Sequence, residues 1–229
     1  MRLDRFICKH SELSQGAARR AVVLGHVHVN DRVEREPRYE VDRFARVCLE
    51  GVCLQECQAY YLMLNKPAGY LSATRDPVHP TVLELLPAEL RDQLHIGGRL
   101  DRATTGLLLL TNDGRWSRRV TEPGKKVPKV YRVTTARPIA PETVESFAKG
   151  IYFAYEDITT SPAHLELLGA CEARLTIYEG RYHQVKRMFG HLRNQVVALH
   201  RESMGAIELD RSLAPGEFRA LNEAEIASV

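Results

Sequence analysis

The stretch Gly98–Thr111 reads GRLDRATTGLLLLT and joins a polar loop to an apolar run. The run holds four consecutive leucines, Leu107–Leu110, and starts directly after a glycine. A short uncharged run bounded by turn residues is typical of a strand that is buried on both faces. Asp101 stands a few residues before this run, between two arginines. The stretch therefore predicts a carboxylate held on a loop at the end of a core strand.

The residues around Asp101 limit its chemistry. Arg99 and Arg102 favour the ionised carboxylate, and the glycines on either side allow a tight backbone course. An ionised carboxylate is a poor general acid and a weak base, but it serves as a nucleophile, an ion-pair partner or a metal ligand. The stretch supplies neither a second metal ligand nor a second acid. Two roles stay open: a cap or ion pair within the loop, with Thr104 or the arginines, and a lone nucleophilic or charge-stabilising carboxylate in a cleft.

The composition is that of an ordinary globular protein. The 229 residues allow one or two domains, and a hydrophobic content of 44% is ample for a packed core. The start of the chain has no apolar signal region, and no run reaches the roughly 18 apolar residues of a membrane span. We therefore expect a cytoplasmic protein that does not bind membranes.

The five cysteines predict reduced thiols, because their number is odd and none forms a Cys-x-x-Cys pair. A zinc site would have to combine cysteines with histidines at a spacing that matches no zinc-binding pattern: Cys48, Cys53 and Cys57 with His10, His26 or His28. We expect these residues to be structural and the protein to hold no metal.

The net charge of +3 is small, but the charges are unevenly distributed. The segment 115–137 has eight basic residues and one acid, and the segment 181–201 has five basic residues and no acid, whereas 142–179 is acidic. Either basic segment alone fits a solvated surface. Two such segments favour a polyanion as partner.

Residues 1–55 read as a small separate unit of two helices and a hairpin. Leu3, Phe6 and Ile7 have helical spacing, Ser14 is placed to cap a second helix, and Gly25 is placed to end it. Three valines then surround a tight turn at Asn30–Asp31: Val27, Val29 and Val33. A generic helical hairpin with a following turn remains the alternative.

Residues 60–229 read as an α+β domain with a mixed, mostly antiparallel sheet, after a linker between 50 and 59. The predicted strands are 60–64, 107–111, 130–135, 173–177 and 196–199, and the predicted helices are 141–149 and 183–191. In the last helix an apolar stripe belongs to the core: Val185, Met188, Phe189 and Leu192.

Several motifs carry a resemblance to a known family. GRLDRATTGLLLLT resembles the pseudouridine synthase signature GRLDxxTxGLLLLT, with every fixed position matched. Three further stretches are similar in order and spacing to the RsuA branch of that family: LNKPAGYLSA at 64–73, KVYRV at 129–133 and EGRYHQVKRMF at 179–189. The N-terminal unit resembles the S4 RNA-binding domain, although Asp31 stands where that domain usually has glycine. Aspartate tolerates left-handed backbone, so we expect the turn to form.

The resemblance implies an S4 domain at 1–55, a catalytic domain with an RNA-binding cleft at 60–229, and a reaction. Such enzymes isomerise a uridine to pseudouridine in RNA without cofactor or metal, and this branch acts on uridine 516 of 16S ribosomal RNA. The expected partner is therefore 16S rRNA, free or in a partly assembled small-subunit particle, bound by a monomer.

The resemblance also implies roles for individual residues. Asp101 matches the catalytic aspartate, Tyr131 the tyrosine that stacks on the base and moves a proton, and Lys186 the cation that pairs with the aspartate. The remaining expected contacts to RNA or to the uridine are Arg99, Ile177, Arg19, Arg20, Arg181 and Arg187. Without the resemblance, Tyr131 reads as an ordinary core tyrosine of a strand.

Two other functions compete with RNA isomerisation. A noncatalytic RNA-binding or ribosome-assembly factor would need no site, and it is disfavoured because Asp101, Tyr131 and Lys186 are all present. A small-molecule glycosidase using Asp101 is disfavoured by the basic segments and by the absence of a paired carboxylate.

Overall fold

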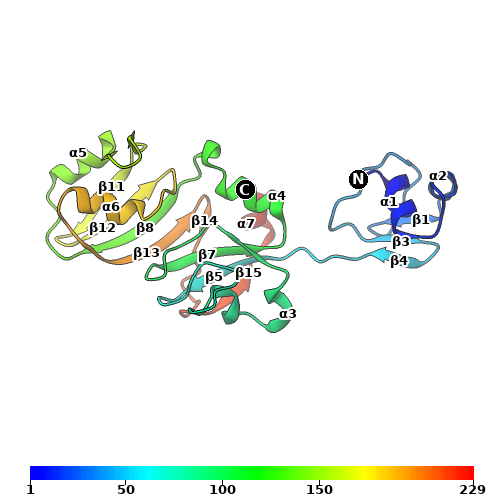
Figure 1. The fold of residues 1–229 in the computed structure, drawn as a ribbon, viewed down its shortest axis with the longest axis horizontal. Coiled ribbons are helices and arrows are strands. Elements are labelled where there is room, and N and C mark those ends of the chain that lie inside the picture. Colours follow the sequence, from blue (N-terminus) through cyan, green and yellow to red (C-terminus); the bar gives the residue numbers. More distant parts are fainter. The chain divides into compact units, whose positions relative to one another are not determined.

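The computed structural model describes residues 1–229, apart from the side chain of Pro123. The chain divides into two compact units (Figure 1), Met1–Ala59 and Tyr60–Val229, here called the small unit and the large unit. No helix in the described part of the chain has the length and apolar character needed to cross a bilayer.

The small unit packs two helices on a four-stranded antiparallel sheet. Helices α1 (Leu3–His10) and α2 (Gln15–Leu24) are followed by strands in the order β2-β1-β3-β4, with bounds β1 Val27–Val29, β2 Arg32–Val33, β3 Val47–Leu49 and β4 Val52–Gln55. The Ser14 hydroxyl accepts a hydrogen bond from the Ala17 amide, and Gly25 ends α2 with a left-handed φ of 82°. Asn30 and Asp31 both take positive φ (49° and 63°), as a tight hairpin turn requires.

The large unit is built on a nine-stranded sheet whose path runs β11-β12-β8-β13-β7-β5-β15, with β14 beside β13 and β6 beside β7. Among the described residues every strand pairing of this sheet is antiparallel except that of β7 with β13. The bounds of its strands are β5 Tyr61–Lys66, β6 His95–Gly97, β7 Thr105–Thr111, β8 Lys129–Thr135, β11 His164–Gly169, β12 Glu172–Ile177, β13 Val196–Met204, β14 Ile207–Glu208 and β15 Phe218–Ala220. The predicted α+β class with a mixed, mostly antiparallel sheet is confirmed.

Short helices and one separate ribbon complete the large unit. Strands β9 (Tyr152–Phe153) and β10 (Ile158–Thr159) pair only with each other among the described residues. The helices are α3 Ala88–Arg91, α4 Gly114–Thr121, α5 Glu142–Lys149, α6 Gln184–His191 and α7 Glu223–Ala227, with 3-10 turns at Val82–Leu85 and Pro123–Lys125.

Strand β7 is buried on both faces, as its sequence predicts. Leu108 and Leu110 pack into a cluster with Leu62 and Leu64 of β5. Leu107 and Leu109 belong to a second cluster that contains Trp116 of α4. All four leucines of β7 are fully buried, so the chain enters the core of the large unit directly after the loop that carries Asp101.

Two strands extend beyond their predicted ends. Strand β5 continues through Asn65 and Lys66, because Lys66 pairs with Gly106 of β7 although its charge interrupts the apolar pattern. Strand β13 continues from Leu199 to Met204, because it lies between β8 and β7 and is held by both. Non-local pairing extends both strands past the point where the local pattern fades.

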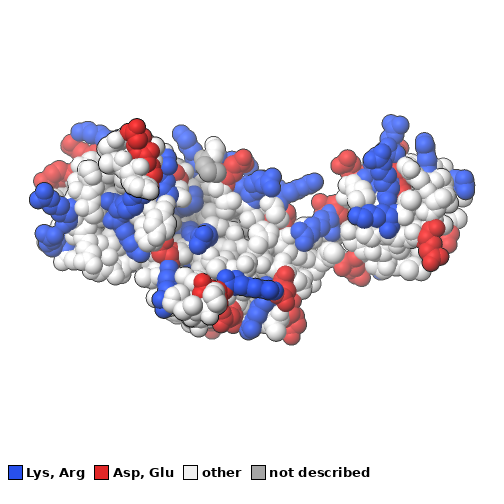
Figure 2. All heavy atoms as spheres, viewed as in Figure 1, with Lys and Arg blue, Asp and Glu red and all other residues white. Residues whose placement is uncertain are grey.

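The basic segments are only partly available at the surface. Figure 2 shows Lys and Arg side chains at several places on the visible face of the large unit, interspersed with acidic side chains. In the segment 115–137 four basic residues are exposed around α4 and the following turn: Arg115, Arg118, Lys125 and Lys126. Arg132 instead pairs with Glu172, with 2.7 Å between Nε and Oε1. Counting charges in the sequence therefore overstates the number of free cations.

Candidate active site

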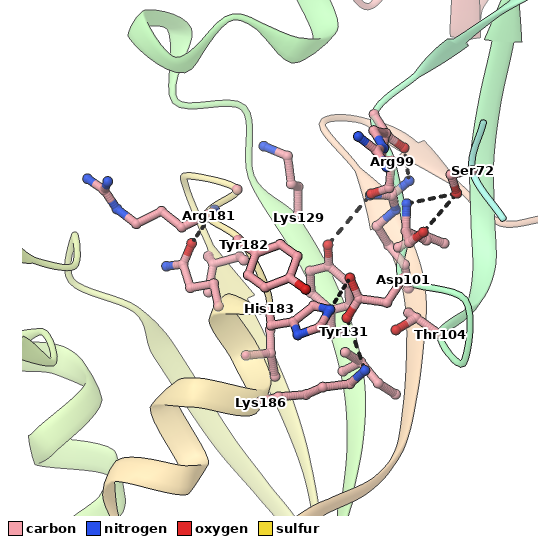
Figure 3. Close-up of a pocket in the computed structure, with 18 of the residues that line it drawn as sticks. Ser72, Arg99, Asp101, Thr104, Lys129, Tyr131, Arg181, Tyr182, His183 and Lys186 are labelled. Atoms are coloured by element: carbon pink, nitrogen blue, oxygen red, sulfur yellow. Dashed lines mark hydrogen bonds and ion pairs between the residues drawn. The ribbon is translucent and has the colours of Figure 1, made fainter. Parts of the chain in front are cut away.

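The loop between Gly98 and Thr104 lies along a cavity of about 740 Å³ in the large unit (Figure 3). Residues of β8, β12 and β13 also line this cavity, together with residues 179–186, which run into α6. The site therefore combines stretches that are far apart in the sequence, and the sheet brings them together.

Asp101 is half-buried, and each of its carboxylate oxygens faces a different basic side chain. Lys186 Nζ donates to Oδ2 at 3.0 Å, and His183 Nε2 lies 3.4 Å from Oδ1. Both partners stand at the start of α6, Lys186 in its first turn and His183 at its N-cap. An ionised carboxylate in such a cleft loses part of its hydration, and neighbouring cations offset that loss. The predicted proximity of Lys186 to Asp101 is thus present, with a second partner that the sequence interpretation did not include.

Lys66 holds the main chain around Asp101 through hydrogen bonds to carbonyl oxygens. Its fully buried ammonium group donates to three carbonyl oxygens: those of Pro67 at 2.9 Å, Arg102 at 3.2 Å and Thr104 at 2.8 Å. Burial lowers the pKa of Lys66 to about 8, while the nearby charge of Asp101 acts in the opposite direction. Because two of the three acceptors, the carbonyl oxygens of Arg102 and Thr104, lie in the loop just after Asp101, Lys66 holds the carboxylate in place through the main chain.

Ser72 holds the other side of the same loop. Its hydroxyl donates to the carbonyl oxygen of Leu100 at 2.8 Å and accepts from the Leu100 amide at 3.0 Å. Leu100 directly precedes Asp101, so the backbone is hydrogen-bonded on both sides of the carboxylate. This degree of fixation is what a reacting group needs if it is to keep one direction.

Arg201 of β13 connects the loop to Tyr131. Its buried guanidinium donates to the carbonyl oxygens of Leu107 and Gly98, both at 2.8 Å, and lies 3.5 Å from the Tyr131 hydroxyl. Tyr131, on β8, is 7% exposed and lines the cavity. The buried cation therefore orients both the start of the loop and the tyrosine hydroxyl.

The sequence interpretation missed four residues of this site: Lys66, Ser72, His183 and Arg201. Lys66 and Arg201 interrupt the apolar pattern of strands β5 and β13, and a buried charge in a core strand is rarely tolerated without a dedicated set of partners. A charged residue that interrupts the apolar pattern of a core strand is the sequence signal that could have identified Lys66 and Arg201. His183 carries no such signal, because its closeness to Asp101 depends on the three-dimensional fold.

The other predicted RNA or uridine contacts differ in their setting. Ile177 is buried at the end of β12 and lines the cavity, and Arg99 is exposed on the cavity rim. Arg181 also lines the cavity, with its Nε 3.2 Å from Glu179 Oε2. Arg19 and Arg20 are exposed on α2 of the small unit.

Arg187 has a different environment from the one predicted for it. It is absent from the lining of the cavity, its Nη1 donates to Glu156 Oε1 at 2.6 Å, and its guanidinium lies 3.8 Å from the centre of the Phe153 ring. Neighbouring positions on a helix point in directions about 100° apart, so Lys186 faces Asp101 while Arg187 is directed to Glu156. Local partners thus occupy the guanidinium that was expected to contact RNA.

The described residues hold no group of three or more His, Cys, Asp or Glu side chains that could bind a metal ion. Cys48 and Cys53 lie opposite each other on β3 and β4 of the small unit. His10, on α1, stacks on Phe6. The chemistry that the cavity supports is that of an oriented carboxylate beside a tyrosine, an arrangement suited to a nucleophilic or charge-stabilising role.

Comparison with known proteins identifies the family. Residues 60–191 match the family model for RNA pseudouridylate synthases, and residues 1–47 match that for the S4 domain. The chain is 56% identical to ribosomal small subunit pseudouridine synthase A of Pseudomonas aeruginosa and 47% identical to the protein of that name in Escherichia coli K12, in both cases over the full length of both chains. It also resembles a crystal structure of a pseudouridylate synthase, with a TM-score of 0.73 and 40% identity over 100% of this chain and 99% of the other. The chain therefore belongs to the RNA pseudouridylate synthase family and carries an S4 domain, as the motifs of its sequence predict.

Proposed function

We propose that this protein isomerises uridine 516 of 16S ribosomal RNA to pseudouridine, with Asp101 as the catalytic carboxylate. The names of its full-length relatives support the small ribosomal subunit as the source of the RNA. The observation that carries the proposal is the placement of Asp101, between Lys186 and His183, in a cavity that Tyr131 also lines.

The reaction breaks the bond between N1 of uracil and C1′ of ribose and forms a bond between C5 and C1′. N1 ends with a proton and C5 loses one, so the overall change is an isomerisation that needs no cofactor. Positive charge develops on the sugar as the N1–C1′ bond breaks, and an ionised carboxylate stabilises or traps that charge, as in glycoside hydrolysis. In this proposal Asp101 supplies the carboxylate, and Lys186 pairs with it at 3.0 Å and orients it.

The remaining cavity residues fit the base. A flipped uracil needs a flat apolar surface on which to rest, and Ile177 and Tyr131 supply one inside the cavity. The Tyr131 hydroxyl, oriented by Arg201, is the group that we assign to proton movement at C5. Arg99, on the rim, is assigned to holding the flipped nucleotide.

The small unit is proposed to select the rRNA. An S4 domain covering residues 1–55 would contact phosphates through Arg19 and Arg20, while residues 60–229 would form the catalytic domain. We propose that the enzyme acts as a monomer in the cytoplasm, on 16S rRNA either free or within an assembling particle.

The test measures tritium released from C5 of labelled uridine in 16S rRNA, since pseudouridine has the same mass as uridine. Wild-type protein should release tritium from a single site, and Asp101→Asn should release none while rRNA affinity stays within a few-fold. Asp92→Asn is a matched control, because Asp92 is highly exposed and lies outside the cavity lining. Parallel reactions on free rRNA and on partly assembled particles identify the preferred substrate. Binding without release by the wild type would instead indicate a noncatalytic RNA-binding factor.

A further inference from the structure

Tyr182 and His183 form a stacked pair at the cavity (Figure 3). Their ring centres are 3.9 Å apart and their planes differ by 18°. Both residues line the cavity, yet the tyrosine is 77% exposed. One face of the Tyr182 ring therefore covers the imidazole, while most of the remaining ring surface is open to solvent.

The backbone beneath this pair is held in an unusual conformation. His183 has φ 48° and ψ 32°, in the left-handed region that side chains with a Cβ rarely adopt. The segment is fixed by the buried Gln184, whose side-chain oxygen accepts from the Arg181 amide at 3.0 Å and whose nitrogen donates to Glu179 at 2.8 Å. Strained backbone that the surrounding structure maintains is a feature of functional sites. The stacked pair is thus presented in a set direction by a rigid support.

The Tyr182 ring has little structural use in the protein itself. A tyrosine this exposed buries little apolar surface and so contributes little to folding. Exposed aromatic rings beside basic groups are, however, the surfaces on which unpaired RNA bases stack. Arg181, directly before Tyr182, lines the same cavity, and its Nε lies 3.2 Å from Glu179 Oε2.

We propose that Tyr182, backed by His183, stacks on the base of a nucleotide adjacent to the target uridine. The inference rests on the proposed function, because removing a uridine from its stack leaves a neighbouring base without a stacking partner. Tyr182 replaces that partner. Since the His183 ring also lies 3.4 Å from Asp101, the occupied stack fixes the imidazole against the carboxylate.

The first experiment compares Tyr182→Ala, Tyr182→Phe and Tyr155→Ala in binding to a 16S rRNA transcript. Tyr155 is the matched control, because it is 96% exposed and lies outside the cavity lining. Loss of one base–aromatic stack should weaken binding roughly 5- to 100-fold in Tyr182→Ala. The phenylalanine variant and the control should stay within about twofold of wild type, since the Tyr182→Phe ring still stacks.

Salt dependence separates stacking from a phosphate contact. Stacking releases no counterions, so the slope of log affinity against log salt should be the same in Tyr182→Ala and wild type. Arg181→Gln is the contrast, and it should lower the slope by up to about one if Arg181 contacts a phosphate. Equal affinities of Tyr182→Ala and Tyr155→Ala, or a slope changed by Tyr182→Ala, would overturn the stacking proposal.

A second readout detects the stacked base directly. A 16S rRNA fragment with 2-aminopurine next to the target uridine should lose fluorescence when wild type or Tyr182→Phe binds, and the loss should be much smaller with Tyr182→Ala. Equal quenching of 2-aminopurine by wild type, Tyr182→Phe and Tyr182→Ala would show that the neighbouring base does not stack on Tyr182. Tritium release by the wild type is measured on the same transcript, so a failure of the stacking proposal is distinguished from a failure of the proposed function.

Discussion

At the scale of single residues, the site is a carboxylate whose charge and direction are set by its neighbours. Asp101 has Lys186 on one oxygen and His183 on the other, and its backbone is held through Lys66 and Ser72. Lys186 and His183 act on the carboxylate itself, whereas Lys66 and Ser72 act through the main chain. Variants of the two groups should therefore fail in different ways.

Lys186→Met should reduce turnover more than rRNA affinity. Removing Lys186 leaves the half-buried Asp101 carboxylate without one of its two basic partners, so its charge is less well stabilised and its direction less well defined. We therefore expect turnover on bound RNA to fall about 10- to 100-fold. Lys186→Arg should restore part of the loss, because it returns the charge with a different geometry. Single-turnover tritium release at saturating protein gives the rate.

Lys149→Met is the matched control for this comparison, because Lys149 is highly exposed on α5 and pairs only with Glu145 among the described residues. It should leave turnover unchanged. If Lys186→Met weakened binding, lowered the salt slope by about one and left turnover intact, Lys186 would be a phosphate contact and the proposed ion pair would have no catalytic role.

Lys66 should make folding stability depend on alkaline pH. Its pKa is lowered by burial from 10.5 to about 8, so between these values the folded protein has lost a proton that the unfolded chain keeps. The free energy of unfolding therefore rises with pH across this window, by up to about 3 kcal/mol from this one group, and the contribution is lost as the pH falls through about 8. Urea unfolding at several values between pH 8 and 10.5 measures the rise.

Lys66→Met is the reference for that titration. It should be less stable at every pH, because three buried carbonyl groups lose their donor, and its stability should lack this rise. If the free energy of unfolding changed with pH in the same way in wild type and Lys66→Met, the three hydrogen bonds would be keeping Lys66 protonated in spite of its burial.

At the scale of elements, the contact between β7 and β13 determines where the Asp101 loop ends and β7 begins. Gly106 of β7 pairs with Arg201 of β13, and its φ of +100° lies in the region that favours glycine. A Cβ at this position would stand 2.4 Å from the Arg201 carbonyl oxygen and 2.7 Å from its amide nitrogen. Only glycine allows the two strands to approach this closely.

Gly106→Ala should therefore destabilise the protein by about 3 kcal/mol, through strained backbone and forced separation of the strands. It should also reduce turnover, because Arg201 holds the start of the Asp101 loop and the Tyr131 hydroxyl. Gly114→Ala is the control, since nothing lies within 4 Å of a Cβ there. Denaturant unfolding checks the prediction, and equal stability of the two variants would contradict it.

The sequence predicts those elements whose residues alone determine their environment. The four leucines of β7 need no partner to be read as a core strand, and Ser14 and Gly25 delimit α2 through local hydrogen bonds and backbone freedom. The ends of β5 and β13 could not be predicted, because pairing with distant strands continues them through charged residues. For the same reason Lys66 and Arg201 were not predicted as site residues, because most of their carbonyl partners are far away in the sequence.

In the candidate site, too, some residues could be predicted from the sequence and others depend on the fold. The family motifs led to Asp101, Tyr131 and Lys186, whereas His183 and the ion pair of Arg187 with Glu156 depend on how α6 is placed. A motif records which residues occur together, and only the fold shows which way their side chains point.

At the scale of the whole molecule, attraction to RNA depends on cations that remain free after folding. Arg132, Arg181 and Arg187 each have a carboxylate partner, and Arg201 is buried. The exposed cations of α4 and the turn after it remain for a polyanion (Figure 2). Because so many basic residues of the large unit are neutralised locally, the cations of the small unit should make a substantial contribution to rRNA binding.

Removing residues 1–59 tests that contribution. The hydrophobic cluster of the small unit lies entirely between Leu3 and Leu54, and the two clusters of the large unit lie entirely beyond residue 59. Since the large unit has hydrophobic clusters of its own, residues 60–229 should fold alone with a cooperative unfolding transition. The truncated protein should bind 16S rRNA more weakly than the full chain and with a shallower dependence on salt.

Arg19 and Arg20 are the side chains to which we assign part of this effect, because both are exposed on α2. Replacing both with Gln in the full chain should lower the slope of log affinity against log salt by up to about two, the value expected for two lost phosphate contacts. Turnover on bound rRNA should be unchanged, since neither residue belongs to the cavity. Replacing the exposed Arg5 and Lys9 of α1 in the same way shows whether the face of α2 or the charge of the small unit as a whole is responsible. If the α2 variant kept the wild-type slope while the truncated protein lost affinity, the small unit would bind rRNA through a different face.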